Sequence, residues 1–346
     1  MFSRPVKPDF QRLRTALFRG EPDRVPTAEI LVDPPIKNAF MGEKIDTLEK
    51  EVKFCIQAGY DHVTLNAGLW GAGNAPTVGQ RGATTNTKEW AQEGEGLITS
   101  FDDFERFPWE DLRIDLSKFD EIGGIMPPGM KAIAYSGKIF MTTWMLMGFY
   151  TFSFALEDNE ELVKEMFAKI GSIYVEGFER VCHYDTVGGL WIGDDLAFNV
   201  APMINPKYLR KYVFPHYKKI CNLAKQKGIP IIFHSDGNLW PVMDDLIACG
   251  FNALHPIEPL AMDINEVKAK VGNKLCIMGN IDLSYTLTRG TPQEVKAEVR
   301  KRIEDLAPGG GYVVSSSNSI TYYVPIENYV AMLEAVFEYG KYPVTR

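Results

Sequence analysis

From about residue 185 onward, short apolar segments alternate with longer amphipathic ones, and this alternation restricts the fold more than any other feature of the chain. The five apolar segments read "TVGGLWIG", "IPIIFH", "FNALHPI", "KLCIMGNI" and "GYVVSSS". Each is apolar on both faces, as is typical of strands in a parallel sheet that helices cover. Asn205–Pro206 and Thr291–Pro292 have the pattern of an N-cap followed by a proline in the first helical turn. The second half of the chain therefore predicts a strand–helix repeat.

The first half is less regular but adds further units of the same kind. Counting both halves predicts eight strands, at residues 25–32, 62–67, 139–145, 187–193, 230–234, 252–257, 275–281 and 312–316. Eight alternating units favour an α/β fold of the (β/α)8 TIM-barrel type, with an insertion in the N-terminal half. A doubly wound open sheet is the alternative, although no GxGxxG follows the first strand. We expect one domain over residues 1–346, with 68–135 as an insertion or excursion at the barrel mouth.

Composition excludes several classes of partner. The formal net charge is −8 and no Lys/Arg block occurs, which argues against binding to nucleic acid or to an anionic membrane. The most apolar stretch, "IFMTTWMLMGFYTFSFAL", contains Thr142, Thr143 and Gly148, so a buried strand and helix are expected there rather than a membrane span. The five cysteines form no CxxC pair and no signal-like segment opens the chain, so a cytoplasmic location is expected. An apolar helix is expected at 146–157, and packing of this helix against a second copy of the chain would form a homodimer.

Polar residues gather at the predicted carboxyl ends of the strands. In a barrel these ends and the loops after them form the active site. In strand order the residues at these ends, all polar except Trp144, are Glu29; Asn66; Trp144; Asp194 and Asp195; His234 and Asp236; His255 and Glu258; Asn280 and Asp282; and Ser315, Ser316, Ser317 and Asn318. The opposite ends carry Gly, Pro, Lys and Phe. This one-sided distribution predicts an enzyme.

Each of these residues also has a structural explanation. The aspartates can cap helices or bind loop amides, and Asp236 before Gly237 is a common turn pair. His255 precedes Pro256, which favours a structural role. His234 and Asp236, two residues apart at a strand exit, can point to the same mouth. With Glu258 from the next strand they form a candidate Zn²⁺ site, or alternatively a general acid–base pair.

Several stretches resemble the uroporphyrinogen decarboxylase superfamily. They are "GLWIGDDLAF", "PIIFHSDGNLWPVMDDLIACGFNALHPIEP", "LCIMGNID", "TPQEVKAEVRKRIEDLAPGGGYVVSSSNSI" and "VPIENYVAMLEA". The resemblance covers roughly residues 20 to 345 and implies a (β/α)8 barrel. True uroporphyrinogen decarboxylases carry arginines in an "MRQAGRY"-like stretch after the first strand, where this chain reads "TAEILVDPPIKNAF". Without those cations the carboxylates of a porphyrinogen would lack partners.

Another branch of the superfamily comprises zinc-dependent methyltransferases that work with corrinoid proteins. Members that act on a thiol carry an HxC pair after the fifth strand and a further cysteine after the eighth. Here His234 matches the histidine, whereas Asp236 stands where the first cysteine would be and Ser316 or a neighbouring serine where the second would be. The resemblance thus implies an oxygen-rich site and an oxygen-bound methyl group.

The resulting hypothesis is a methyltransferase component of anaerobic metabolism. It would move a methyl group from a methoxylated aromatic (as an O-demethylase) or a similar donor to a corrinoid protein. The alternative is a decarboxylase-like lyase acting on a carboxylated substrate. The expected cofactors are zinc and the corrinoid of the partner. Metal ligands would be His234, Asp236 and Glu258; catalytic residues Asp195, Glu29 and Asn280; and substrate-binding residues Asp194, Asn66, Trp144, Asp282 and Asn318.

Overall fold

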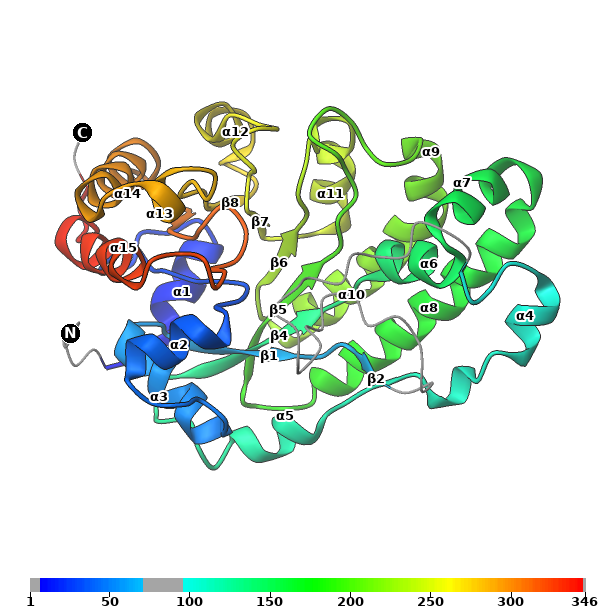
Figure 1. Cartoon of the computed structure of the whole chain (residues 1–346), viewed down its shortest axis with the longest axis horizontal. Helices are drawn as coiled ribbons and strands as arrows, with labels where there is room; N and C mark the ends of the chain where they lie inside the picture. Colours follow the sequence, from blue (N-terminus) through cyan, green and yellow to red (C-terminus); the bar gives the residue numbers. More distant parts are fainter. Residues whose placement is uncertain (1–6, 71–95, 345–346) are drawn as a thin grey trace.

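The computed structural model describes residues 7–70 and 96–344, and its centre is a curled parallel sheet (Figure 1). Seven strands follow the order β1-β4-β5-β6-β7-β8-β9, and each neighbouring pair is parallel. Their bounds are β1 His62–Asn66, β4 Lys131–Ser136, β5 Val187–Gly193, β6 Ile231–His234, β7 Ala253–His255, β8 Cys276–Met278 and β9 Tyr312–Val313. A second, antiparallel pair joins β2 Leu69–Trp70 to β3 Arg113–Ile114. The predicted α/β barrel-like fold is confirmed.

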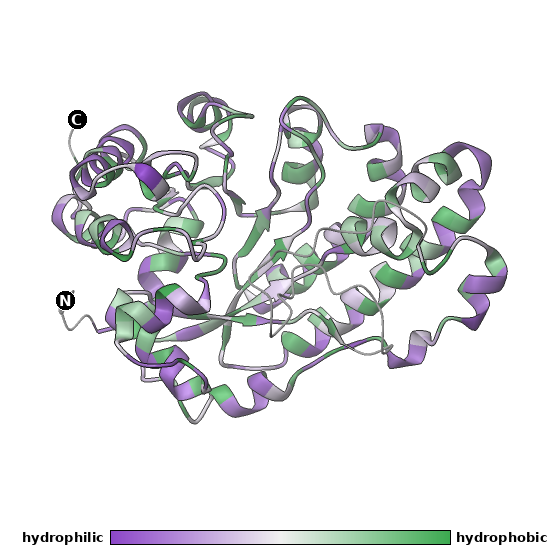
Figure 2. Cartoon of the chain, viewed as in Figure 1, coloured by the Kyte–Doolittle hydropathy of each residue, from purple (hydrophilic) through white to green (hydrophobic). Residues whose placement is uncertain are grey.

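Helices surround this sheet along the whole chain. They are α1 Phe10–Leu17, α2 Pro34–Met41, α3 Leu48–Ala58, α4 Phe101–Arg106, α5 Ser117–Ile122, α6 Ile139–Met147, α7 Phe149–Asp158, α8 Glu160–Val181, α9 Pro206–Tyr208, α10 Phe214–Lys227, α11 Met243–Cys249, α12 Ile264–Val271, α13 Thr286–Arg289, α14 Pro292–Leu306 and α15 Ile326–Tyr339, with short helical turns at Trp109–Asp111, Leu209–Val213 and Trp240–Val242. Figure 2 shows both hydrophilic and hydrophobic residues along most helices, as expected where one face is buried.

The inside of the curled sheet is filled from its N-terminal end. Phe10, Leu13 and Leu17 of α1 share one buried cluster with inward-facing residues of successive strands, among them Ile133 and Trp191. Gly188, near the start of β5, leaves room for the Phe10 ring, since an added Cβ would lie 2.6 Å from it. Helix α1 therefore closes the N-terminal end of the sheet, which leaves the carboxyl ends of the strands for a site.

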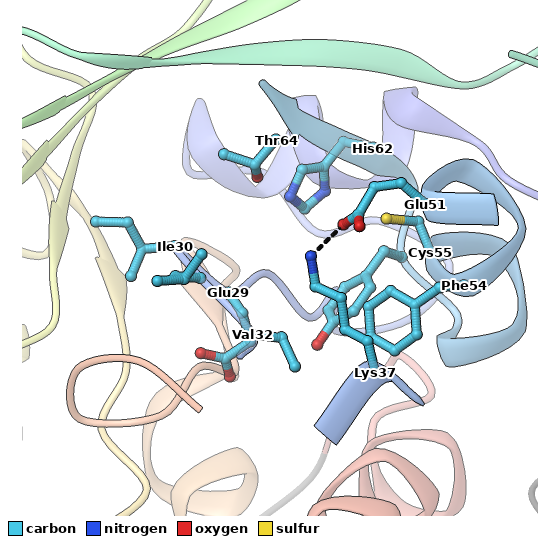
Figure 3. Close-up of a pocket in the computed structure, with 11 residues that line it drawn as sticks. Glu29, Ile30, Val32, Lys37, Glu51, Phe54, Cys55, His62 and Thr64 are labelled. Atoms are coloured by element: carbon cyan, nitrogen blue, oxygen red, sulfur yellow. Dashed lines mark hydrogen bonds and ion pairs between the residues drawn. The ribbon is translucent and has the colours of Figure 1, made fainter. Parts of the chain in front are cut away.

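The predicted first strand, 25–32, continues the sheet beyond β9 through isolated contacts. Thr27 forms a parallel bridge with Val314, and Val32 forms one with Ile320. No strand ladder joins this segment to β1 within residues 7–70 and 96–344. A cavity lies between the two instead, and we call it the seam cavity (Figure 3). Its lining includes Glu29, Lys37, Glu51, His62 and Thr64.

The predicted third strand, 139–145, is wrong: these residues belong to α6, and the strand is β4 at Lys131–Ser136. Burial on all sides makes an apolar run equally compatible with a strand or a helix. The Asp194 carboxylate stabilises the helix, because it accepts the N–H groups of Phe140 (2.7 Å) and Met141 (2.8 Å) at the start of α6. The expected insertion at 68–135 thus overlaps a barrel strand at its end, and 71–95 lies outside the described residues.

The apolar stretch expected to be buried divides between α6 and α7. Within the described chain, no single helix is long and apolar enough to cross a membrane. The two helices meet that criterion only as a pair, which is bent by 96°. Phe140, Met147 and Phe152 are buried inside the protein.

Candidate functional site

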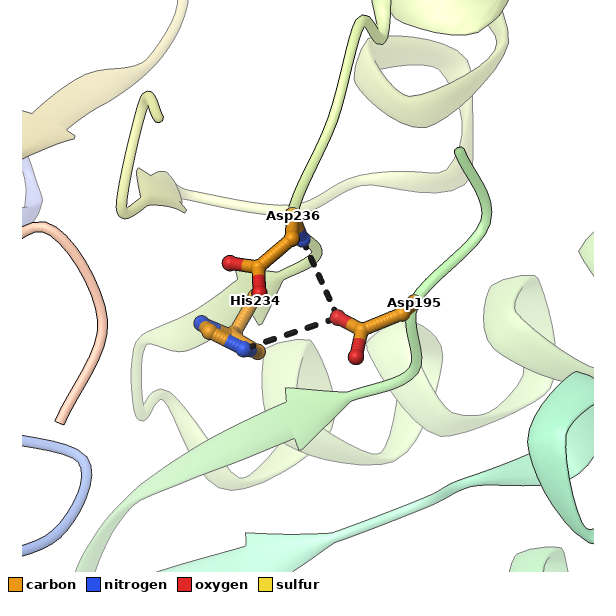
Figure 4. Close-up of side chains that lie close together, drawn as sticks. All are labelled: Asp195, His234 and Asp236. Carbon is orange, nitrogen blue, oxygen red and sulfur yellow. Dashed lines mark hydrogen bonds and ion pairs between the residues drawn. The ribbon is translucent and has the colours of Figure 1, made fainter. Parts of the chain in front are cut away.

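Three metal-capable side chains meet at the carboxyl ends of β5 and β6 (Figure 4). They are Asp195, His234 and Asp236, whose candidate ligand atoms all lie within 4.8 Å of one another. The register of the parallel pair explains the meeting, because Gly193 at the end of β5 is paired with His234 at the end of β6. Asp195 Oδ1 lies 3.6 Å from His234 Nε2 and accepts the Asp236 N–H at 3.0 Å. We call these three residues the mouth cluster.

Two further contacts fix the loops that carry the cluster. Asn318, from the loop after β9, donates through its amide to Asp236 Oδ2 at 2.6 Å. Ser235 accepts the Leu196 N–H at 2.9 Å, which ties the loop after β6 to the loop after β5. The predicted residues Asp195, His234, Asp236 and Asn318 are therefore brought together, from three separate strand ends.

The loop after β6 has its conformation fixed by Gly237. This residue has a φ of +85°, and a Cβ added there would lie 2.4 Å from the Ala197 carbonyl oxygen. We expect Gly237→Ala to destabilise the fold by about 1–3 kcal/mol and to displace Asp236, because both strain and overlap oppose the side chain. Urea unfolding and Zn²⁺ titration would measure the two effects.

Gly228→Ala is the matched control for this prediction. Gly228 has a similar φ of +72°, but nothing lies within 4 Å of an added Cβ. It should lose stability through backbone strain alone and keep its metal affinity. Equal Zn²⁺ affinity in the two variants would show that the loop does not depend on Gly237.

A row of buried polar side chains runs from the mouth cluster across the sheet. His234 Nδ1 lies 2.7 Å from His255 Nδ1, and His255 Nε2 lies 2.9 Å from Ser315 Oγ. Ser315 Oγ is in turn 3.3 Å from Glu29 Oε2. Glu29 also accepts the Ser316 N–H at 2.8 Å and the Ser316 hydroxyl at 2.6 Å. We call His234, His255, Ser315 and Glu29 the buried row.

Burial sets the protonation of the buried row. It lowers the pKa of His234 and places the pKa of His255 well below its usual range, so both imidazoles are neutral near pH 7. Burial also raises the pKa of Glu29 to about 8, in spite of the hydrogen bonds from Ser316 and Ser315. The sequence suggested a structural role for His255; its contact with His234 places it beside the site.

Lys138 is a charged residue near the mouth that the sequence analysis missed. It follows β4 and precedes α6, so it became a strand-end residue only once the third strand was placed correctly. Burial lowers its pKa, whereas the nearby charges of Asp195 and Asp194 raise it. A lysine so placed adds positive charge beside Asp195 of the mouth cluster.

Other predicted site residues are engaged elsewhere in the fold. Asp194 is fully buried and, besides starting α6, accepts the Tyr217 hydroxyl at 2.6 Å; burial raises its pKa to about 7. Asp282 accepts the N–H groups of Ser284 and Tyr285 just before α13. Asn66 is exposed and accepts the Gly68 N–H. Asp194 is thus hydrogen-bonded to helices α6 and α10, and Asp282 and Asn66 are hydrogen-bonded to the loops that carry them.

The remaining three do not join the cluster. Glu258, predicted as a metal ligand, accepts the Gly237 N–H at 3.0 Å instead. Asn280 is buried and donates to the Ile257 carbonyl at 2.7 Å. Trp144 is buried within α6 and does not end a strand. In the metal-capable cluster, Asp195 stands where the sequence suggested Glu258.

The mouth cluster fits a divalent metal ion in its donor chemistry. One imidazole nitrogen and two carboxylates suit Zn²⁺ and related ions. Ligands of metals in proteins are commonly held by a second hydrogen bond, and here His255 holds His234 and Asn318 holds Asp236. The residues present could therefore hold the zinc that the sequence suggested.

The comparisons with known proteins agree on one family and one fold. A family model described as "Uroporphyrinogen decarboxylase (URO-D)" matches residues 125–339. The uroporphyrinogen decarboxylase of Actinobacillus succinogenes is 30% identical over 169 residues, which are 48% of this chain and 43% of that protein. The one of Dechloromonas aromatica is 24% identical over 253 residues, covering 68% of this chain and 66% of its own. The chain thus spans less than half the length of the first relative.

Among solved structures, a methyltransferase from Methanosarcina mazei is similar over 95% of this chain and 98% of its own, with a TM-score of 0.69. The sequence identity is 19%, so the likeness concerns the fold.

Proposed function

Because this chain belongs to the uroporphyrinogen decarboxylase family, we propose that it uses the fold of that family for methyl transfer. It would move a methyl group from an oxygen-bound donor, such as a methoxylated aromatic, to the corrinoid of a partner protein. The observation that carries this proposal is the mouth cluster, in which Asp195, His234 and Asp236 gather at the carboxyl ends of β5 and β6.

The chemistry of the cluster supports an oxygen-bound methyl group. Zn²⁺ held there would act as a Lewis acid on the ether oxygen, which stabilises the phenolate that leaves. His234, Asp195 and Asp236 would bind the ion, and the Asn318 amide would keep Asp236 in place. Lys138 would offset part of the negative charge of Asp195.

The region after the first strand gives little support to porphyrinogen decarboxylation. Between Glu29 and Gly42 the chain has a single cationic side chain, Lys37. It forms an ion pair with Glu51 beside the seam cavity, where it is only 14% exposed (Figure 3). The several carboxylates of a porphyrinogen would therefore meet no free cation in this segment, whereas a methyl donor requires none.

Exposed apolar side chains in loops and on helix α7 support a protein partner. They are Leu31, Tyr150, Phe154, Phe198, Val200, Leu260, Tyr285, Tyr322 and Tyr323. Exposed aromatic residues are enriched at protein interfaces. A corrinoid-binding protein that docks on these loops would bring its cofactor to the mouth cluster.

Metal analysis combined with a Co(I)-corrinoid methylation assay would test the proposal. The purified chain should bind about one Zn²⁺, and it should methylate Co(I) with at least one donor from a panel of methoxylated aromatics and methylamines. Absence of methylation with every donor would contradict methyl transfer. Release of CO₂ from a carboxylated substrate without corrinoid would establish the lyase alternative instead.

A further inference from the structure

Each hydrogen bond between neighbouring side chains of the buried row is made by a single proton. A hydrogen bond between two ring nitrogens requires one proton, so one of the two Nδ1 atoms of His234 and His255 donates and the other accepts. A neutral imidazole carries its proton on only one nitrogen. The proton position on either histidine therefore fixes the position on the other, and the whole row has two possible directions.

The Glu29 end of the row determines which direction is adopted. An ionised carboxylate only accepts, so Ser315 donates its hydroxyl proton to Glu29. The Ser315 oxygen then accepts from Nε2–H of His255, which leaves Nδ1 of His255 without a proton. That bare nitrogen accepts from Nδ1–H of His234, so Nε2 of His234 carries no proton.

Asp195, at the other end of the row, does not favour the opposite proton direction. Asp195 Oδ1 is 3.6 Å from His234 Nε2, which is too long for a hydrogen bond that would hold a proton there. That oxygen already accepts the Asp236 N–H at 3.0 Å. Glu29, by contrast, is held by three hydrogen bonds from Ser315 and Ser316.

We propose that ionised Glu29 is a positioning residue which, through Ser315 and His255, keeps Nε2 of His234 free of a proton and available to a metal ion. Glu29 lines the seam cavity and is separated from His234 by Ser315 and His255, so it acts on His234 through these two residues. The inference rests on the proposed function only for the use of Nε2; the direction of the protons is a property of the chain alone.

The Glu29→Gln variant should reverse the row. Its amide oxygen is needed as acceptor for the Ser316 N–H, so its NH₂ group takes the place of Oε2 and donates to Ser315. The Ser315 proton then turns to Nε2 of His255. His255 donates from Nδ1 to His234, and His234 carries its proton on Nε2, toward Asp195.

Nitrogen-15 NMR of the metal-free, histidine-labelled protein measures this directly, because protonated and bare ring nitrogens differ strongly in chemical shift. The chain has five histidines, so single replacements can assign the signals. Above about pH 8, where Glu29 is ionised, the natural chain should show a bare Nε2 on His234 and a protonated Nε2 on His255. Glu29→Gln should exchange both assignments. Zn²⁺ affinity, measured by chelator competition, should fall by about 10–100-fold.

Glu51→Gln is the matched control, because Glu51 lines the same seam cavity but is paired with Lys37 outside the row. It should leave both tautomers unchanged. Above about pH 8, a protonated Nε2 on His234 in the natural chain would overturn the proposal, as would unchanged tautomers in Glu29→Gln. If that variant does not fold, Ser315→Ala replaces it and should populate the reversed tautomers. The expected tautomers without any Co(I) methylation would leave this inference standing and remove the proposed function.

Discussion

His234→Ala is expected to lose bound Zn²⁺ and to reduce Co(I) methylation by more than 100-fold. Removing a residue that only supports a metal ligand costs about 10–100-fold, and His234 would be a ligand itself. It supplies the only nitrogen among the three candidate ligands of the mouth cluster. Metal content after gel filtration and the rate of Co(I) methylation would give the two measurements.

His183→Ala serves as control for this loss. His183 is exposed and lies between α8 and the start of β5, on the side of the sheet opposite the mouth. It should keep metal and rate.

Two further variants separate the structural assignment of the third ligand from the sequence-based one: Asp195→Asn should weaken Zn²⁺ binding more than Glu258→Gln. A His234→Ala protein that retains both metal and rate would exclude a metal role for this residue.

The free energy of unfolding of the natural chain is expected to fall, relative to Glu29→Gln, as the pH rises from about 4.5 to about 8. The folded protein raises the pKa of Glu29 from 4.5 to about 8, because the ionised carboxylate is buried. The folded state therefore binds this proton more tightly than the unfolded state. Its stabilising effect is complete below the unfolded pKa and is lost as the pH rises through the folded pKa. The slope is about 1.4 kcal/mol per pH unit at most.

Urea unfolding of both proteins at several pH values would measure this difference. Comparing two variants removes the contribution of the other ionisable groups, which they share. Glu51→Gln again provides the control, since Glu51 is paired with Lys37 and partly exposed. A difference between the natural chain and Glu29→Gln that stays constant with pH would mean that Glu29 keeps an ordinary pKa.

Much of the fold could be predicted, because a parallel sheet leaves a strong pattern in the sequence. The strands from β5 to β9 are short, apolar and separated by amphipathic helices, and all were expected near their observed positions. The third strand could not be found in this way. Its sequence, "KAIAYS", is shorter and more polar than the apolar run that follows, and what makes that run a helix is the distant carboxylate of Asp194. The local sequence pattern cannot reveal a capping carboxylate that lies so far away along the chain.

The site was predicted in part for the same reason. His234, Asp236 and Asp195 were recognisable because all follow strands, yet the sequence analysis named Glu258 rather than Asp195 as the third metal ligand. The choice between them depends on the register between β5 and β6 and on the Gly237 N–H, which binds Glu258. Lys138 was missed together with the third strand.

The contacts of the buried row become more distant in sequence with each step away from the mouth. His234 and His255 are 21 residues apart, His255 and Ser315 are 60 apart, and Ser315 and Glu29 are 286 apart. Closing a longer loop costs more chain entropy, so the last of these contacts forms only when the two ends of the chain have met. The ligands of the mouth cluster thus come from neighbouring strands, whereas the proton direction that prepares them depends on a completed fold. In an incompletely folded chain, the ligands would come together before the position of the proton on His234 is fixed.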